Sequence, residues 1–364
     1  MASFKKSLGV ALALGVFAAV TALSGPLQAA DFSGKTIEWI IPFKEGGGSD
    51  KWSRFYAPLL ADALPGKPTV VVKNMPGAGS TKGANFFASR AKSDGLTIFG
   101  TSGSTQFPYL LNDSRVRYEY KDWNIVLATP TGGVAYLNPE LGVKSAADIG
   151  KLAEIELLYG SQGATSLDLV PLLAFELLGL KVEPVFGMKG RGAGRLAFER
   201  GETNIDYQTS SAYLSKVVPL VEQGLAVPVM SWGALDDAGN IVRDPTFPDL
   251  PSFKEVYVQL KGEEPSGPAW EAWKAFFTAG FPAQKMVFLP KDTDQDIIDA
   301  YTAAFSAVIS APGFAEASKK RLGVYPQSTG EGAKVKLAQA IGVSDEARSW
   351  VKGWLKDRFG VELN

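Results

Sequence analysis

The sequence predicts an α/β protein of two domains, each with a doubly wound, parallel sheet. Three observations support this fold class. Apolar, β-rich segments alternate with helical segments over residues 36–100, and the same alternation recurs over 124–230. Glycine-rich loops follow several of the predicted strands, as in doubly wound sheets. After a 30-residue leader, 334 of the 364 residues remain, enough for two domains that each bury a core.

The first stretch of alternation begins the first domain. We expect strands at 36–42, 69–74 and 96–100, and helices at 50–64 and 80–92. Ser49 and Asp50 form a good N-cap pair for the first helix, which Pro65-Gly66 ends.

The second stretch repeats this pattern. We expect strands at 124–129, 155–159, 182–186, 203–207 and 225–230, and helices at 145–152, 166–178, 191–199 and 211–223. The Pro/Gly-rich segment 129–133 is a natural crossing between domains, and the turn-rich segment 236–251 a natural return. The predicted division is therefore 31–129 with 245–364 as domain I, and 130–244 as domain II.

The remainder of the chain is expected to be helical apart from one strand. The strand is predicted at 285–289, and the helices near 293–309, 313–321, 331–341 and 344–357. The segment 261–275, with Trp270 and Trp273, is predicted to be an inserted surface helix, to which the sequence assigns no role.

The N-terminus has the pattern of an export signal. Lys5 and Lys6 precede an apolar stretch at 8–23, and the small residues Ala29 and Ala30 follow. We expect a cleaved signal peptide, residues 1–30, and a periplasmic protein; a retained membrane anchor is the alternative. No later segment approaches about twenty continuous apolar residues, so we expect the mature chain to be soluble.

Composition excludes several classes of function. With 37 basic and 38 acidic residues, the chain lacks the strongly basic character of nucleic-acid-binding proteins. It contains no cysteine and no histidine, which removes disulfides, thiolate nucleophiles, iron–sulfur clusters, Ser-His-Asp triads and ordinary zinc sites. We therefore predict no catalytic residues, no cofactor and no metal.

Glycine loops at strand ends predict an anion site. Two loops, 43–48 and 75–79, each connect a strand to a helix start, where unpaired N–H groups and the helix dipole favour negative charge. Hydroxyl-rich segments at 100–105 and 159–165 follow two further strands. Each loop alone could be an ordinary capped turn, but together they favour a site at the carboxyl ends of the strands.

Three charged residues have more than one interpretation each. Arg191 enters a helix from the glycine loop 187–195 and would suit a planar carboxylate, or it lies in a solvated turn. Asp206 could accept from a ligand hydroxyl, fix Arg191, or cap the next helix. Asp50 is either an N-cap or a residue of the cleft.

Several motifs resemble the substrate-binding proteins of tripartite tricarboxylate transporters, also called the Bug or TctC-like family. The motifs are Ile41-Pro42-Phe43, Gly46–Asp50, Val71–Gly79 and Ser93–Ile98, with looser matches at Ser161-Gln162-Gly163, Pro248–Pro251 and Leu289–Thr293. The chain departs from the family at three places. Asp168 follows the loop where members commonly carry histidine, residues 186–190 replace a Pro-Tyr-Lys-Gly pattern, and 261–275 is extra.

The resemblance implies a two-domain Venus-flytrap fold, type II-like, with the ligand in a cleft between domains that close by a hinge. It implies carboxylate capture by the first two glycine loops, with the second domain setting specificity. The implied ligand-binding residues are Phe43, Gly47, Gly48, Ser49, Asp50, Gly77, Ala78, Thr101, Ser102, Ser161, Gln162, Gly163, Thr165 and Asp206, to which the residue-level argument adds Arg191.

The predicted function is that of a periplasmic solute-binding protein for a small organic carboxylate, such as a di- or tricarboxylate. Its expected partners are that ligand and the membrane subunits of a tripartite tricarboxylate-type transporter. We expect no nucleic acid, and a monomer. An exported enzyme that uses only carboxylates, for example a glycosidase-like acid pair, is the alternative.

Overall fold

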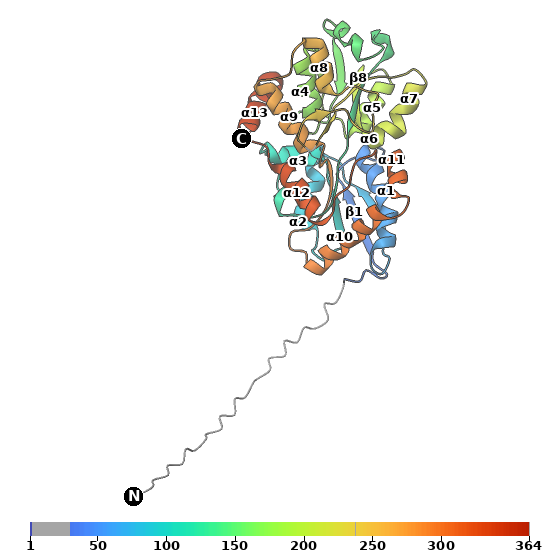
Figure 1. Ribbon diagram of the computed structural model, residues 1–364, viewed down its shortest axis with the longest axis vertical. Coiled ribbons are helices and arrows are strands. Elements are labelled where there is room, and N and C mark those ends of the chain that lie inside the picture. Colours follow the sequence, from blue (N-terminus) through green and yellow to red (C-terminus); the bar gives the residue numbers. More distant parts are fainter. Residues whose placement is uncertain (2–29, 237, 364) are drawn as a thin grey trace.

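The computed structural model describes residues 1, 30–236 and 238–363, which form two lobes stacked along the long axis of the molecule (Figure 1). Residues 2–29 are outside this description, so it does not test the predicted signal peptide or its cleavage near Ala29 or Ala30. Each lobe is built around its own five-stranded sheet.

The sheet of the first lobe has the order β2-β1-β3-β12-β4. Its strands are β1 (Thr36–Ile41), β2 (Thr69–Asn74), β3 (Thr97–Gly100), β4 (Asn124–Thr129) and β12 (Lys285–Leu289). β1 pairs in parallel with β2 and β3, but β12 is antiparallel to both of its neighbours. The expectation of a wholly parallel sheet is therefore wrong, because a strand from late in the chain is inserted between β3 and β4 in the opposite direction.

The sheet of the second lobe is mixed in the same way, with the order β7-β6-β8-β5-β9. Its strands are β5 (Gly133–Leu137), β6 (Leu157–Gly160), β7 (Val182–Val185), β8 (Ile205–Thr209) and β9 (Val227–Ser231). β5, which the sequence did not predict, is antiparallel to β8 and β9. β4 and β5 are consecutive but belong to different sheets, so residues 129–133 connect the lobes. β10 (Ala234–Leu235) and β11 (Ile241–Val242) form a short separate hairpin.

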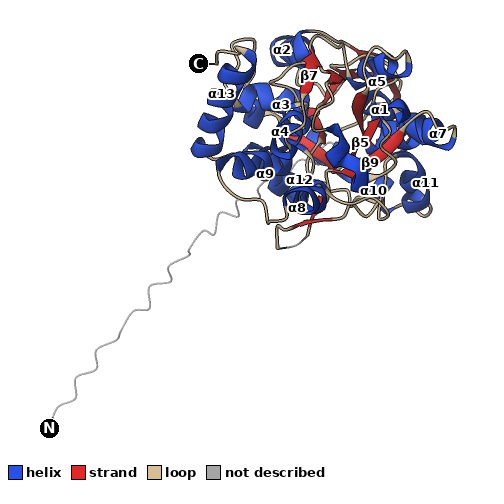
Figure 2. Ribbon diagram, turned by 90° about the horizontal axis from the view of Figure 1, so that it is seen from above, coloured by secondary structure: helices blue, strands red, loops and turns tan. Residues whose placement is uncertain are grey.

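Helices surround the strands (Figure 2). The first lobe contains α1 (Gly48–Ala63), α2 (Thr81–Arg90), α3 (Gly103–Leu110), α10 (Gln295–Ser310), α11 (Phe314–Arg321) and α12 (Gly330–Ile341). The second contains α4 (Leu169–Leu178), α5 (Arg191–Glu199), α6 (Ser210–Ala212), α7 (Val218–Glu222), α8 (Phe253–Lys261), α9 (Pro268–Gly280) and α13 (Asp345–Phe359). A π-helical segment, Tyr213–Val217, joins α6 to α7, and the segment predicted as a helix at 145–152 is a 3₁₀ helix, Ala146–Leu152.

Over the described ranges, no single helix is long and apolar enough to cross a membrane. The pair α10 and α11 satisfies the length and composition criteria only when the two are joined, and they are bent by 88° relative to each other.

The segment predicted as a surface insertion contributes instead to the core. α9 carries Trp270 and Trp273, whose exposed fractions are 7% and 0%, and the Trp273 ring stacks on Phe277 at a centroid distance of 5.0 Å. These side chains share one apolar cluster with residues of α4 and α13. The surface expectation is wrong because the helix buries its aromatic face against the second lobe.

This packing also bears on the domain division, which remains a prediction. α8 and α9 pack with the second sheet, although they follow residue 245. The chain returns to the first sheet at β12 and leaves it again for α13. We therefore expect crossings near residues 129–133, 280–285 and 341–345.

Candidate functional site

A small cavity of about 30 Å³ lies between the lobes at the carboxyl ends of β1 and β3. It is lined by Phe43, Lys44, Gly47, Gly48, Ser49, Ser102, Ser104, Gln162, Leu167, Gly190, Arg191, Thr209, Gln284 and Lys285. A larger groove of about 620 Å³ lies on the outside of α1, α10 and α11, but its lining is mostly apolar. The cavity between the lobes is therefore the candidate site.

Three helices begin at this cavity. Gly48 and Ser49 start α1, Gly103 and Ser104 start α3, and Arg191 starts α5. Within the described residues, the N–H groups of Gly48 and Ser49 donate to no protein acceptor. Free N–H groups and the positive ends of three helix dipoles therefore point toward one small space, which favours an anion.

Asp50 stabilises the first glycine loop by accepting a hydrogen bond from its backbone. The N-cap of α1 is Gly47, so the prediction that Ser49 and Asp50 cap this helix is wrong. Asp50 lies in the first turn of the helix and accepts from Gly46 N at 2.9 Å, Arg54 Nε at 2.9 Å and Asn74 Nδ2 at 3.1 Å. It positions the loop and does not line the cavity.

The second glycine loop does not reach the cavity. Gly77 and Ala78 are absent from the lining. Ser80, which follows them, donates to the carbonyl oxygen of Ser104 at 2.9 Å. The second glycine loop therefore supports the start of α3. The loop after β3 lines the cavity at the position that was predicted for the second glycine loop.

The loop after β3 contributes one predicted and one unpredicted residue to the lining. Ser102 caps α3 by accepting from Ser104 N at 3.2 Å, and it lines the cavity. Thr101 is turned away and shares a 2.8 Å hydrogen bond with Tyr120. Ser104 Oγ accepts from Gln162 Nε2 at 3.3 Å, which bridges the two lobes.

In the loop after β6, Gln162 is the predicted residue that lines the cavity. Ser161 Oγ donates to Asp168 at 3.0 Å and accepts from Gly163 N at 3.1 Å, so both stabilise the loop itself. Thr165 Oγ1 donates to Asp113 at 3.1 Å, in a contact between the lobes away from the cavity.

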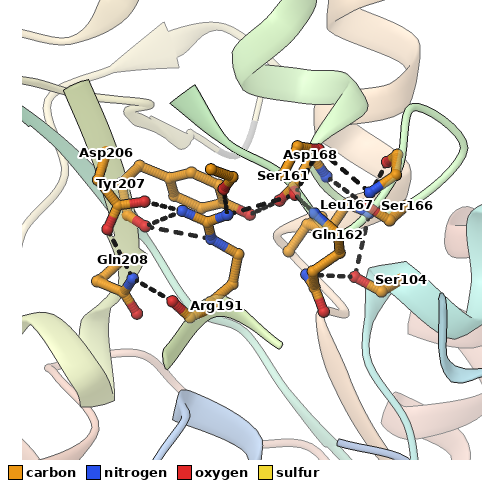
Figure 3. A network of polar contacts seen from close by, with 12 residues as sticks. Ser104, Ser161, Gln162, Ser166, Leu167, Asp168, Arg191, Asp206, Tyr207 and Gln208 are labelled. Carbon is orange, nitrogen blue, oxygen red and sulfur yellow. Dashed lines mark hydrogen bonds and ion pairs between the residues drawn. The ribbon is translucent and has the colours of Figure 1, made fainter. Parts of the chain in front are cut away.

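Arg191 is a buried structural cation (Figure 3). Its guanidinium donates to the carbonyl oxygens of Gly160 at 2.6 Å and of Tyr207 at 3.0 and 3.3 Å. It also donates to Asp168 at 3.3 Å and to Asp206. These contacts use its five N–H groups, so the side chain has no donor left for a ligand. The interpretation of Arg191 as a carboxylate clamp is therefore wrong, and Asp206 fixes it.

The Arg191 cluster carries two buried carboxylates against one guanidinium. Asp206 also accepts from the Tyr136 hydroxyl and from Gln208 Nε2, and Asp168 accepts from the Tyr207 hydroxyl. Burial raises the pKa of Asp206, and the neighbouring guanidinium opposes this rise. The same two carboxylates hold the pKa of Arg191 well above its usual range. The cluster fixes the loop after β6 and the start of α5.

Lys285 is the residue of the lining that sequence reasoning missed most clearly. It is 2% exposed, and its ammonium donates to Gln284 Oε1 at 2.6 Å and, weakly, to Ser49 Oγ at 3.5 Å. Burial lowers the pKa of Lys285 to about 7. Lys285 begins β12, and because β12 is antiparallel to β3, its first residue lies at the edge where β3 ends.

The other unpredicted residues of the lining lie beside predicted residues or on other segments of the chain. Lys44 and Gly190 border predicted residues, whereas Leu167, Thr209 and Gln284 come from the second lobe and from the chain before β12. Thr209 ends β8, so the rule that ligands bind beyond strand ends could have indicated it. Nothing in the local sequence distinguishes Gln284 and Lys285.

Comparison with known sequences confirms the predicted resemblance. No family model matches the chain. Protein BugT of Bordetella pertussis is 37% identical over 91 residues, which cover 25% of this chain and 27% of BugT, so that match spans about a quarter of the relative. The UPF0065 protein of the tcbD-tcbE intergenic region of Pseudomonas sp. strain P51 is 26% identical over 353 residues, covering 93% of this chain and 91% of that protein.

Solved structures confirm the two-lobed fold of periplasmic solute-binding proteins. The periplasmic binding protein BugD matches with a TM-score of 0.66 at 21% identity, over 90% of this chain and 98% of that chain. MatC from Rhodopseudomonas palustris with bound malate matches with a TM-score of 0.63 at 21% identity, over 87% and 97%. An R. palustris protein with adipate gives 0.65 at 18% identity, over 86% and 97%.

Proposed function

We propose that this chain is a periplasmic solute-binding protein that closes its two lobes over a small organic carboxylate. The observation that carries the proposal is the convergence of the N-termini of α1, α3 and α5 on the cavity between the lobes. Such ends bind anions through their unpaired N–H groups. Hydroxyl and amide side chains, such as Ser102 and Gln162, supply the remaining polar groups.

The relatives and structural neighbours support this proposal. They include Bug proteins, and two neighbours of the same fold hold malate and adipate, both organic acids. We further propose that the protein is exported by its N-terminal signal and delivers its ligand to the membrane subunits of a tripartite tricarboxylate-type transporter.

The enzyme alternative fits the cavity less well. Acid–base hydrolysis of a glycoside needs two carboxylates that flank the reacting bond. Among the described residues that line the cavity there is no Asp or Glu. Asp168 and Asp206 lie behind it and are tied to Arg191. The lining therefore favours reversible binding over acid–base catalysis.

The structure is closed. A cavity of about 30 Å³ has room for about two water molecules. The lobes touch directly, since Ser211 Oγ donates to the carbonyl oxygen of Gly48 at 3.1 Å and Lys44 N donates to that of Lys189 at 3.4 Å. We therefore propose that the lobes separate to admit the ligand and then close over it, by a hinge in the segments that connect them.

A thermal-shift and calorimetry panel tests the function. We expect at least one small organic acid to stabilise the mature protein by about 2.7 kcal/mol when its concentration is a hundred times its dissociation constant. The matched control for each acid is its uncharged amide, which the helix N-termini should bind more weakly. If no acid binds and a glycoside is hydrolysed, the enzyme alternative replaces the proposal.

A further inference from the structure

The lining of the cavity contains three cationic side chains in three different situations. Lys44 is exposed to solvent, where a charge interacts weakly with a ligand. The guanidinium of Arg191 is offset by Asp168 and Asp206. Lys285 is buried and forms no salt bridge within the described residues. Lysine is almost never fully buried without a partner of opposite charge, so Lys285 requires an explanation.

The surroundings of Lys285 indicate an anion. Its ammonium has three N–H groups, and its described partners are one amide oxygen at 2.6 Å and one distant hydroxyl. A Cβ built on Gly48 would lie 3.7 Å from Nζ, so the ammonium adjoins the N-terminus of α1. Two positive groups so close together destabilise each other in a buried site, and a carboxylate between them would stabilise both.

The opposite wall offers no comparable group for a second charge. It is formed by Gln162 and Thr209, which are uncharged, and by the start of α5, which carries the partial positive charge of a helix end but no full charge. Behind it lie Asp168 and Asp206, whose two negative charges exceed the single positive charge of Arg191. A second carboxylate on this side would lose its hydration without gaining a buried cation.

We propose that Lys285 is the counter-ion of the ligand carboxylate, and that the cleft selects acids with one carboxylate and an uncharged remainder. This inference rests on the proposed function, and it replaces the predicted di- or tricarboxylate with a monocarboxylate. Malate and adipate, which the two structural neighbours hold, each carry two carboxylates, and these neighbours share 21% and 18% identity with this chain. A shared fold does not transfer a ligand class at such identities.

Calorimetry on matched acids tests the ligand class. The pairs are butyrate with succinate, lactate with malate, and hexanoate with adipate, at pH 7. In every pair that binds, we expect the monocarboxylate to bind at least about tenfold more tightly, since the second charge gains no buried cation. Tighter binding of the dicarboxylates would overturn the selectivity while leaving the proposed function intact. Absence of binding by any acid would overturn both.

Replacing Lys285 tests its role directly. We expect Lys285→Met to bind the best acid at least about 100-fold more weakly, because the buried carboxylate then lacks a counter-ion. Lys189→Met, at an exposed lysine that lies outside the lining, is the control and should change the affinity less than about threefold. Unchanged affinity in a folded Lys285→Met variant would assign the binding to the helix ends alone.

The pH dependence of the wild type provides a readout that does not depend on how a variant folds. In the ligand-free protein the pKa of Lys285 is near 7, so the ammonium form that pairs with a carboxylate becomes rarer as the pH rises. The affinity should therefore fall about tenfold per pH unit above 7, and about 50-fold between pH 7 and 9. The other titratable side chains at the cavity, Lys44 and Arg191, are retained in Lys285→Arg. That variant should therefore show a flat profile. A flat profile in the wild type would contradict the role of Lys285.

Discussion

Arg191→Ala is expected to lower the free energy of unfolding by about 3–5 kcal/mol, because the change leaves two buried carboxylates without their cation. The guanidinium also lies over the rings of Tyr207 and Tyr159, with Cζ 4.5 and 5.0 Å from the ring centroids, and these contacts are lost as well. Urea unfolding at pH 7 measures the effect. A loss below about 1 kcal/mol would show that water readily solvates the cluster.

Two further variants separate charge from packing. Arg200→Ala removes an arginine whose pair with Glu202 is exposed, 56% and 54%, and should cost less than about 0.5 kcal/mol. Combining Arg191→Met with Asp168→Asn and Asp206→Asn leaves none of the three charges of this cluster, and should recover most of the stability lost in Arg191→Ala.

The pH dependence of the Arg191→Ala variant has a defined sign. Without the guanidinium, burial raises the pKa of Asp206 further above its value in the unfolded chain. A carboxyl with a raised pKa favours the folded state while it is protonated, and this contribution is lost as pH rises through the folded-state pKa. The variant should therefore lose less stability relative to the wild type at pH 5 than at pH 8.

The local sequence was sufficient to place most elements and the first glycine loop. Periodicity located β1, β2 and β12 within one residue of their ends, since these strands are apolar and bounded by turn residues. The glycine loop after the first strand also indicated an anion site, and Gly47, Gly48 and Ser49 line the cavity.

Tertiary pairing determined what the local sequence could not. Lys285 reaches the cavity only because β12 enters the sheet antiparallel to β3, and strand direction is not encoded in the apolar run at 285–289. The second loop, with Gly77 and Ala78, is glycine-rich like the first, but it is not part of the lining, and Ser80 after it contacts the start of α3. Arg191 resembled a ligand clamp because its two acids come from distant segments.

Gly48→Val is expected to weaken binding of the best acid at least about 100-fold while leaving the fold intact. A Cβ at this position would lie 2.3 Å from Thr209 Oγ1 and 3.2 Å from Ser211 Oγ, both on the second lobe, so the lobes could not close over the ligand. The φ angle of Gly48 is not in the positive region, and valine at the start of a helix costs less than about 1 kcal/mol. Calorimetry and urea unfolding measure the two effects.

A rescue experiment distinguishes this steric mechanism from general damage to the loop. Gly48→Ala introduces the same Cβ, and adding Thr209→Ala removes the atom that this Cβ would meet first. The double variant should therefore bind the acid at least about tenfold more tightly than Gly48→Ala alone. Gly353→Val, in α13 where a Cβ would meet nothing within 4 Å, should bind like the wild type. If Gly48→Ala alone binds like the wild type, the ligand-bound lobes do not approach each other at Gly48, and the first glycine loop cannot be the closing surface of the site.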